Sequence, residues 1–254
     1  MTVQITDLIA TLRAAQRITV LTGAGVSAES GIPTFRDPLT GLWEKYDPSA
    51  LATPGAYRGD PPLVWGWYEW RRMKVLRAQP NPAHLALARM AALVPELILV
   101  TQNVDDLHER AGSPGVLHLH GRLMKPICFA CHRPHALPPG IPDLPEGGAR
   151  IDPPRCTHCD GKVRPGVVWF GERLPESEFN AAAKAAHRCQ VFLCIGTSAV
   201  VQPAASLLDM AAEASAVTVQ INPNPTAADN TVDYALRGPA GAVLPDLVAQ
   251  VWGT

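Results

Sequence analysis

Residues 20–36, with the sequence Val-Leu-Thr-Gly-Ala-Gly-Val-Ser-Ala-Glu-Ser-Gly-Ile-Pro-Thr-Phe-Arg, most constrain how this chain can fold. The segment begins as a buried strand and enters a turn in which Gly23, Gly25 and Ala28 fill the spacing G-x-G-x-x-G/A of a dinucleotide-binding loop. Glycines allow the backbone to turn tightly and to approach a pyrophosphate, and a following helix points its amino-terminal amides at the anion. The segment therefore predicts a strand, a phosphate-binding turn and a helix in succession.

The sequence after this turn departs from that of a hydride-transfer enzyme. Such an enzyme places an acidic residue about 20 residues further on, at the end of a second strand, where it holds a ribose. Here residues 33–38, Pro-Thr-Phe-Arg-Asp-Pro, have the composition of a loop. We infer that a dinucleotide is bound, but not in the manner of a dehydrogenase.

Apolar runs typical of buried strands recur along the chain, and helical patterns lie between them. The runs are residues 18–21, 97–101, 191–195 and 217–221, and the helical patterns are residues 6–16, 83–93, 175–187 and 204–214. Such alternation indicates a parallel sheet covered on both faces, and ligands of such sheets bind at the carboxyl ends of the strands. The polar residues that follow the strands are Thr22, Gly23, Thr101, Gln102, Asn103, Gly196, Thr197, Ser198, Asn222, Pro223 and Asn224. We expect them to converge on one site.

Two stretches interrupt this alternation. Residues 37–79 are rich in tryptophan and proline and include a helix around residues 63–78, whereas residues 123–165 contain cysteine pairs and little regular pattern. We interpret both as insertions into one discontinuous sheet domain, which consists of residues 1–36, 80–122 and 166–254. A chain of 254 residues with 47% hydrophobic content is large enough for this arrangement.

Charge and hydropathy argue against several kinds of partner. A formal net charge of -1 provides no basic field for nucleic acid or an anionic membrane. No apolar run reaches the roughly 18 residues that a membrane span needs, and the first residues lack the basic and apolar regions of a signal peptide. We therefore expect a cytoplasmic protein without nucleic-acid or membrane partners, and we expect a monomer.

Four of the six cysteines form two C-x-x-C pairs, which are separated by the 24 residues 132–155. In a reducing compartment such pairs favour a metal over disulfides, and four thiolates complete a tetrahedral zinc shell without an open position. We expect one structural zinc ion on Cys128, Cys131, Cys156 and Cys159, with His132, His135 and His158 outside the shell and Cys189 and Cys194 in the core. The alternatives are four unpaired thiols or a nucleic-acid-binding zinc ribbon, although residues 137–148 are acidic and proline-rich.

Residues 101–108 carry polar side chains directly after a predicted strand. Amides both donate and accept hydrogen bonds, so Gln102 and Asn103 suit a ribose or a carboxamide. Asp105 could accept a hydrogen bond from a carboxamide or steady a developing cation. Helix capping by Asn103 or Asp105 is the alternative interpretation.

His118 and His120 lie on the same side of the chain if this segment is extended. Histidine suits general-base catalysis near neutral pH, although a lone histidine is more often structural. Gly121 would allow the backbone to approach another segment closely, which favours a functional role for the segment.

The combination of these motifs resembles the sirtuins, a family of NAD-dependent protein-lysine deacylases. The matching motifs are residues 23–36, 101–105, 118–121, both cysteine pairs, 196–198 and 221–222, in the order of the family, and the resemblance extends from about residue 15 to residue 248. Val26 and Val104 replace the usual isoleucines, and Asp37 and Pro38 follow Phe35-Arg36 in place of small residues, which could alter loop closure over NAD. The resemblance implies an α/β fold, namely a Rossmann-like parallel sheet domain with an inserted zinc-ribbon module and a helical insertion.

The resemblance also implies a role for each segment. His120 would be the general base, Asn103 and Asp105 would face the nicotinamide pocket, and residues 167–172 would form an exposed strand to which a substrate peptide pairs. A further core strand is the alternative for residues 167–170. The expected cofactor-binding residues are Gly23, Ala24, Gly25, Ala28, Phe35, Arg36, Trp43, Gln102, Asn103, Asp105, Gly196, Thr197, Ser198, Asn222, Pro223, Asn224 and Ala240. The expected substrate-binding residues are Ala52, Tyr68, Arg71, Val167, Val168, Trp169, Phe170 and Gly171.

Tyr68 and Arg71 stand three residues apart in a predicted helix and therefore share a face. They match the Tyr-x-x-Arg pair of the sirtuin subgroup that removes succinyl, malonyl or glutaryl groups. A guanidinium binds a carboxylate through two hydrogen bonds, and the tyrosine hydroxyl adds a neutral donor. Ala52 stands where other subgroups have a bulkier residue, which would enlarge the acyl pocket. The alternative is a surface arginine beside a half-buried tyrosine, and we expect Arg72 to point elsewhere and to matter little.

The implied reaction begins when the amide oxygen of an acyl-lysine attacks the nicotinamide ribose and nicotinamide leaves. His120 then takes a proton from a ribose hydroxyl, the sugar oxygen attacks the acyl carbon, and water completes the transfer and releases the lysine. The products would be nicotinamide, O-acyl-ADP-ribose and free lysine, with succinyl and malonyl groups removed and acetyl groups removed more weakly. An NAD-dependent protein ADP-ribosyltransferase and a non-enzymatic zinc-ribbon binding module are the alternative functions.

Overall fold

The computed structural model describes residues 2–33 and 44–253, with side chains described from residue 5 onward within those ranges. Six parallel strands form the main sheet in the order β3-β2-β1-β6-β7-β8. Their bounds are β1 Arg17–Thr22, β2 Glu96–Thr101, β3 Leu117–His118, β6 Val191–Ile195, β7 Val217–Asn222 and β8 Tyr234–Arg237. The predicted parallel sheet is thereby confirmed.

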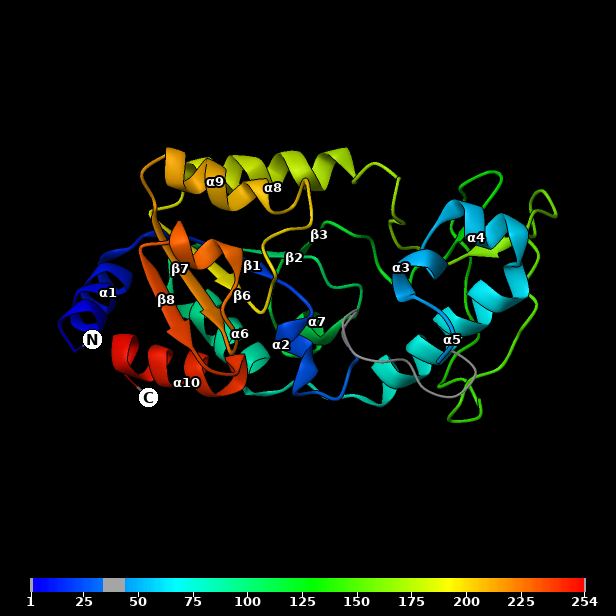
Figure 1. Ribbon diagram of the computed structural model, residues 1–254, viewed down its shortest axis with the longest axis horizontal. Helices are drawn as coiled ribbons and strands as arrows, with labels where there is room; N and C mark the ends of the chain where they lie inside the picture. The colour runs from blue at the N-terminus through cyan, green and yellow to red at the C-terminus, as the bar shows by residue number, and fades with distance from the viewer. Residues whose placement is uncertain (1, 34–43, 254) are drawn as a thin grey trace.

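Helices cover both faces of this sheet (Figure 1). One face packs against α1 (Thr2–Ala14), α6 (Pro82–Leu93) and α10 (Ala240–Trp252), and the other packs against α8 (Glu176–Arg188) and α9 (Ser206–Glu213). The burial of strand β6 on both faces explains why its sequence is a continuous apolar run. Val191, Leu193 and Ile195 pack into the first cluster, whereas Phe192 and Cys194 pack into the second, so every residue of the strand is buried.

A smaller part of the molecule lies beside the sheet, at the end opposite both chain termini (Figure 1). It contains α3 (Pro48–Leu51), α4 (Pro54–Gly59), α5 (Pro61–Arg77) and an antiparallel pair, β4 (Ile127–Cys128) and β5 (Val163–Arg164). The three helices follow one another closely because Asp47, Thr53 and Asp60 each cap the next helix and a proline begins it. Both predicted insertions contribute to one apolar cluster, in which Trp67 and Val163 are completely buried.

The polar loops gather at the carboxyl ends of the strands. The chain continues from β1 to β2 and β3 on one side and later returns to β6 on the other side of β1. Such a reversal of strand order is the position at which open α/β sheets bind ligands. The short helices α2 (Gly25–Ala28) and α7 (Leu107–Arg110) follow β1 and β2 at this edge, and the short helix η2 (Ala227–Asn230) follows β7.

Residues 167–172 are not the exposed strand that we expected. The structure shows only a single antiparallel bridge between Gly121 and Val167, with Val167 and Trp169 buried and Phe170 exposed. The amide of Glu172 donates to the carbonyl of Trp169, which closes a turn and prevents a longer ladder. Within the part of the chain that the structure describes, no helix is both long enough and apolar enough to cross a membrane.

Candidate functional site

The glycines of the first motif lie where the loop after β1 meets the loop after β6. The Gly25 amide donates to the carbonyl of Gly196 over 2.8 Å, and the Gly23 amide donates to the carbonyl of Ile195 over 3.0 Å. A Cβ on Gly25 would lie only 2.8 Å from the Cα of Gly196, so the contact between the loops itself requires glycine. Ala28, the third position of the motif, is exposed at the end of α2. The glycines therefore position the two loops in addition to any contact with a phosphate.

Two further strand ends, those of β2 and β7, join this contact. The side-chain amide of Asn222 donates to the Thr197 carbonyl over 2.9 Å, and that of Gln102 donates to the Thr197 hydroxyl over 3.3 Å. The predicted residues after β2, β6 and β7 thus lie together. Ser198 is half-buried beside them, Pro223 and Asn224 are exposed, and Ala240 is buried as the first residue of α10.

Ser27 on α2 connects the two polar residues that were expected near nicotinamide. Its hydroxyl donates to Asp105 Oδ2 over 3.0 Å and accepts from the side-chain amide of Asn103 over 3.1 Å. The Leu107 amide donates to the other carboxyl oxygen of Asp105. Burial raises the pKa of Asp105, although the bonds from Leu107 and Ser27 oppose this shift. Asp105 is therefore a buried carboxyl group held in a fixed orientation.

His84 on α6 extends this network and was not predicted from the sequence. Its Nδ1 accepts from the Asn81 amide over 3.3 Å, so Nε2 carries the proton and faces the Ser27 hydroxyl at 3.4 Å. Burial lowers the pKa of His84 to about 4, which keeps the ring neutral. His84 lies inside an ordinary helical pattern, and Ser27 lies inside the glycine motif. Neither pattern identifies these two residues as parts of the site, and it is their almost complete burial in the structure that does so.

His120 has the geometry of a general base. Its Nδ1 lies 2.9 Å from the carbonyl oxygen of Gln102, and because a carbonyl only accepts, Nδ1 carries the proton and Nε2 the lone pair. Burial lowers the pKa of His120, with the bond to Gln102 opposing the shift, so the ring is neutral near pH 7.

The backbone at His120 and Gly121 is joined to the predicted substrate segment. The Val168 amide donates to the His120 carbonyl over 2.8 Å. Gly121 has a φ of 74°, and a Cβ at this position would lie 2.3 Å from the carbonyl oxygen of Gly166. The close backbone approach that Gly121 predicted is present, and it places His120 beside residues 167–168.

His118 has different surroundings. It is buried, its Nδ1 faces the Asn103 carbonyl at 3.2 Å, and its Nε2 faces Glu109 Oε1 at 2.7 Å. Burial raises the pKa of Glu109, but the bond and charge of His118 outweigh this effect and the net pKa is lowered. Because acceptors occupy both ring nitrogens, His118 holds the Asn103 loop and has no nitrogen left for general-base catalysis.

Tyr68 and Arg71 lie on α5, as predicted, and both approach this site. The indole of Trp169 donates to the Tyr68 hydroxyl over 3.0 Å. The guanidinium carbon of Arg71 lies 5.2 Å from the Trp67 ring centroid. Burial lowers the pKa of Arg71, while electrostatic interactions with Tyr68 and then Asp105 oppose the shift.

The other residues that were predicted to bind the substrate also lie near one another. Ala52 is buried, and its carbonyl accepts from the Phe170 amide over 2.9 Å, which joins the loop before α4 to the substrate segment. Val168 is half-buried, and Gly171 is exposed beside Phe170. Ala52, Tyr68 and residues 167–170 thus belong to one neighbourhood.

Arg72 points elsewhere, as expected, but it is not a free surface residue. It is buried and pairs with Glu69 through Nε at 3.0 Å and Nη2 at 2.9 Å. Its Nη1 also donates to the carbonyl of Gly140 over 3.4 Å. Removing one partner of a buried ion pair leaves a charge uncompensated, so substitution of Arg72 would cost stability. The expectation that Arg72 matters little therefore does not extend to folding.

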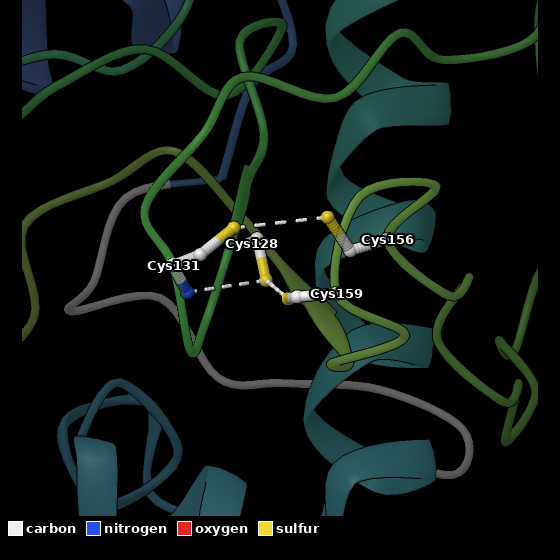
Figure 2. A group of neighbouring side chains, drawn as sticks. All are labelled: Cys128, Cys131, Cys156 and Cys159. Carbon is white, nitrogen blue, oxygen red and sulfur yellow. Dashed lines mark hydrogen bonds between the residues drawn. The ribbon is translucent and has the colours of Figure 1, made fainter.

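The four cysteines of the C-x-x-C pairs converge on one point (Figure 2). Their sulfur atoms all lie within 4.8 Å of one another, with Cys128 and Cys159 at 3.5 Å and Cys131 and Cys156 at 3.8 Å. Sulfurs about 2.3 Å from a tetrahedral zinc ion are about 3.8 Å apart, so the group fits zinc. Amides of Cys131 and Ala130 donate to Cys128 Sγ and lower the pKa of this thiol to about 6, which favours the thiolate.

The remaining cysteines and histidines agree with the sequence prediction. All six cysteines are free thiols, and Cys189 and Cys194 are buried in the core. Within the described part of the chain, His132, His135 and His158 lie outside the potential metal-binding group, and His158 instead contacts Arg133. Phe129, between the first two cysteines, stacks edge-on against Tyr57 with ring centroids 5.1 Å apart, and Tyr57 also contacts Trp169. The cysteine module therefore supports the wall that contains Trp169.

Three predicted cofactor-binding residues, Phe35, Arg36 and Trp43, lie outside the described residues, as do Asp37 and Pro38.

Comparison with known proteins gives a consistent result. Residues 23–203 match the Sir2 family. A protein of Methylococcus capsulatus named NAD-dependent protein deacylase is 60% identical over 242 residues, which cover 95% of each chain. A protein of Archaeoglobus fulgidus named NAD-dependent protein deacylase 1 is 47% identical over 245 residues, which cover 96% of each chain.

Solved structures show the same similarity. A structure described as a Sir2 homolog–NAD complex has a TM-score of 0.88 and 47% identity, and the match covers 97% of this chain and 93% of that chain. Another, described as Sir2–p53 peptide–NAD+, has a TM-score of 0.83 and 26% identity, and the match covers 97% of this chain and 98% of that chain.

Proposed function

Because the chain belongs to the Sir2 family, we propose that it is an NAD-dependent protein deacylase that favours acyl groups ending in a carboxylate. The family predicted from the sequence, and with it the prediction of an enzyme, is confirmed. The acyl preference rests on one observation: Tyr68 and Arg71 lie one turn apart on α5, and the Tyr68 hydroxyl is hydrogen-bonded to Trp169 of the predicted substrate segment. A guanidinium beside a hydroxyl donor suits a terminal carboxylate better than a methyl group.

The residues present fit NAD. Amide side chains, a buried carboxyl group and a neutral imidazole gather at the carboxyl ends of β1, β2, β6 and β7. NAD, when bound, would supply an activated ribose carbon and receive the acyl group, and one water molecule would complete the reaction, so that the products are nicotinamide, O-acyl-ADP-ribose and free lysine. We place Asn103 and Asp105 at the nicotinamide. We assign the loops after β1 and β6, together with Asn222 and Ala240, to the ADP-ribose.

His120 is the base in this proposal. Its Nε2 accepts a proton from a sugar hydroxyl, and the bond from Nδ1 to the Gln102 carbonyl keeps the ring in the required tautomer. Residues 167–170 present the acylated lysine, because the His120 carbonyl is bonded to the Val168 amide. The zinc ion has a structural role, since four thiolates leave no open position.

The setting of the reaction is also part of the proposal. Acylated lysine side chains of proteins are the substrates, and a reducing compartment such as the cytoplasm would keep the thiols available to zinc. The monomeric state, the absence of nucleic-acid and membrane partners, and the division into a sheet domain and two insertions stay predictions.

The substitution Arg71→Met tests the acyl preference. A charge-assisted hydrogen bond contributes about 1.5–3 kcal/mol, so kcat/KM for a succinyl-lysine peptide should fall about 10- to 100-fold. The value for the same peptide carrying acetyl-lysine should change far less, because the acetyl group offers no carboxylate. Steady-state assays of nicotinamide release provide both values.

Arg77→Met is the matched control, because Arg77 lies on the same helix but is exposed and pairs with Glu146 at the surface. It should leave the ratio of succinyl to acetyl activity unchanged. Equal losses on both substrates in Arg71→Met would show that Arg71 does not recognise the acyl group.

A further inference from the structure

Trp169 is enclosed on every side by groups of the site. Its side chain is 1% exposed, and its indole Nε1 lies 3.0 Å from the hydroxyl of Tyr68, which is itself 3% exposed. Tyr68 is 101 positions earlier in the chain, and the two rings are tilted against each other with centroids 6.4 Å apart. Trp169, which belongs to the predicted substrate segment, is therefore hydrogen-bonded directly to Tyr68, which we assign to the acyl group.

The polarity of this hydrogen bond is fixed by chemistry. An indole N–H only donates, so the Tyr68 oxygen must accept, and the hydroxyl keeps its own proton for another partner. The neighbouring Arg71 guanidinium also only donates. The guanidinium donors of Arg71 and the Tyr68 hydroxyl proton are matched best by a group that accepts on both of its terminal atoms. A carboxylate has two accepting oxygens, whereas a carboxamide has one.

Trp169 is held in place by a partly buried ion pair between Arg164 and Glu172. The guanidinium carbon of Arg164 lies 3.5 Å from the Trp169 ring centroid. Arg164 Nη2 donates to Glu172 Oε2 over 2.9 Å, and the same oxygen accepts from the Trp169 amide over 2.8 Å. Stacking on one side and the backbone bond on the other leave the indole little freedom to turn away from Tyr68.

We propose that Trp169 is a positioning residue for acyl specificity, which directs the Tyr68 hydroxyl proton toward the terminal carboxylate of the acyl group. This inference rests on the proposed acyl preference. In this proposal, three side chains from two distant segments select a carboxylate. Tyr68 and Arg71 contact the acyl group, and Trp169 orients Tyr68.

A double-mutant cycle tests the proposal. Wild type, Trp169→Phe, Tyr68→Phe and the double variant are assayed on one peptide carrying either succinyl-lysine or acetyl-lysine. Loss of one neutral hydrogen bond should lower kcat/KM for the succinyl peptide about 2- to 10-fold in Trp169→Phe, mainly through KM. The acetyl value should fall by a clearly smaller factor, so the ratio of succinyl to acetyl activity should fall. In the Tyr68→Phe background, Trp169→Phe should no longer alter the ratio of the two activities.

Trp70→Phe is the control, because Trp70 also lies on α5 and is buried, but its indole donates to the Glu146 carbonyl over 2.9 Å. It should leave the ratio unchanged. Equal losses on both substrates in Trp169→Phe, or the same change of ratio with and without Tyr68, would overturn the inference. If Arg71→Met and Tyr68→Phe leave the ratio unchanged, the acyl preference fails as well. If those two lower the ratio and Trp169→Phe does not, this inference alone fails.

A second measurement needs no substitution at Trp169. Wild type should discriminate strongly between a succinyl-lysine peptide and its analogue with a terminal carboxamide of the same length, because the carboxamide NH₂ cannot accept a hydrogen bond from Arg71 or from the Tyr68 hydroxyl. The ratio of the activities on these two peptides should be smaller in Tyr68→Phe than in wild type. Wild-type enzyme that accepts both peptides equally would overturn the proposal even if Trp169→Phe failed to fold.

Discussion

His118 and His120 carry the same side chain two positions apart, yet their surroundings differ, and we propose different roles for them. Alternation along the sequence places both on one side and cannot separate them, and the assignment of His120 as base came from the family resemblance. The structure offers a physical reason for the distinction, since both nitrogens of His118 meet acceptors, whereas within the described residues the His120 ring is hydrogen-bonded through Nδ1 alone. Such a choice depends on which backbone carbonyl faces each ring, and the sequence does not contain that information.

The pH dependence of activity tests the role of His120. The base works as the neutral ring, and burial lowers its pKa, so activity should be complete near pH 7 and be lost as the pH falls through a value below the ordinary 6.5. The profile of kcat/KM is measured with an acetyl-lysine peptide, whose acyl group does not titrate. NMR titration of the His120 ring distinguishes this limb from Asp105, whose pKa burial raises.

His120→Ala provides the corresponding variant. It should keep the fold and NAD binding, measured by circular dichroism and calorimetry, and lose deacylation. An acid limb centred above about pH 7, or an active His120→Ala enzyme, would contradict the assignment.

At the scale of elements, the strands buried on both faces were the most predictable. Residues 191–195 were predicted as a strand and β6 has the same bounds, because an apolar run between two helix layers has few other structures available. Strands β3 and β8 lie at the two edges of the sheet and were not predicted, and α10 was missed because Gly241 and Pro245 interrupt its pattern. The apolar residues 167–170 read as a strand, but turn formation at Glu172 prevents a ladder.

The cysteine module should depend on zinc for its structure. Only two short strands, β4 and β5, organise it, so removal of the ion with a chelator should expose the backbone amides between residues 126 and 164. Hydrogen exchange followed by mass spectrometry should show this loss of protection while β1, β2 and β6 stay protected. Returning zinc should restore the protection, and unchanged exchange in the metal-free protein would refute the structural role.

At the scale of the whole molecule, the site depends on contacts between segments that are far apart in sequence. Motif order along the chain predicted that the strand ends converge, and the structure brings Gln102, Thr197 and Asn222 together. The contacts of Ser27 with His84 and of Tyr68 with Trp169 were not predictable. Each joins residues without a shared motif, and only the packing of α2 with α6, and of α5 with residues 167–170, creates them.

Two buried histidines should make the whole molecule sensitive to acid. His84 and His108 are almost completely buried, and burial lowers their pKa values to about 4 and about 3, whereas an unfolded histidine titrates near 6.5. The unfolded chain therefore binds protons first, so this stability is complete above about pH 6.5 and declines as the pH falls toward 4. At about 1.4 kcal/mol per pKa unit, His84 alone corresponds to about 3 kcal/mol.

Urea unfolding between neutral pH and about pH 4.5 measures this effect. The free energy of unfolding of His108→Gln should fall less steeply than that of wild type. Acid release of zinc affects both proteins, so the difference between them isolates the histidine. Parallel pH dependences would contradict the prediction.

The most direct measurement is a mass analysis of the protein incubated with NAD and a succinyl-lysine peptide. We predict equal amounts of nicotinamide, O-succinyl-ADP-ribose and peptide with a free lysine, a slower reaction with the acetyl peptide, and no nicotinamide when the peptide carries no acyl group. ADP-ribose attached to protein with the acyl group retained, or intact NAD in every mixture, would contradict deacylation.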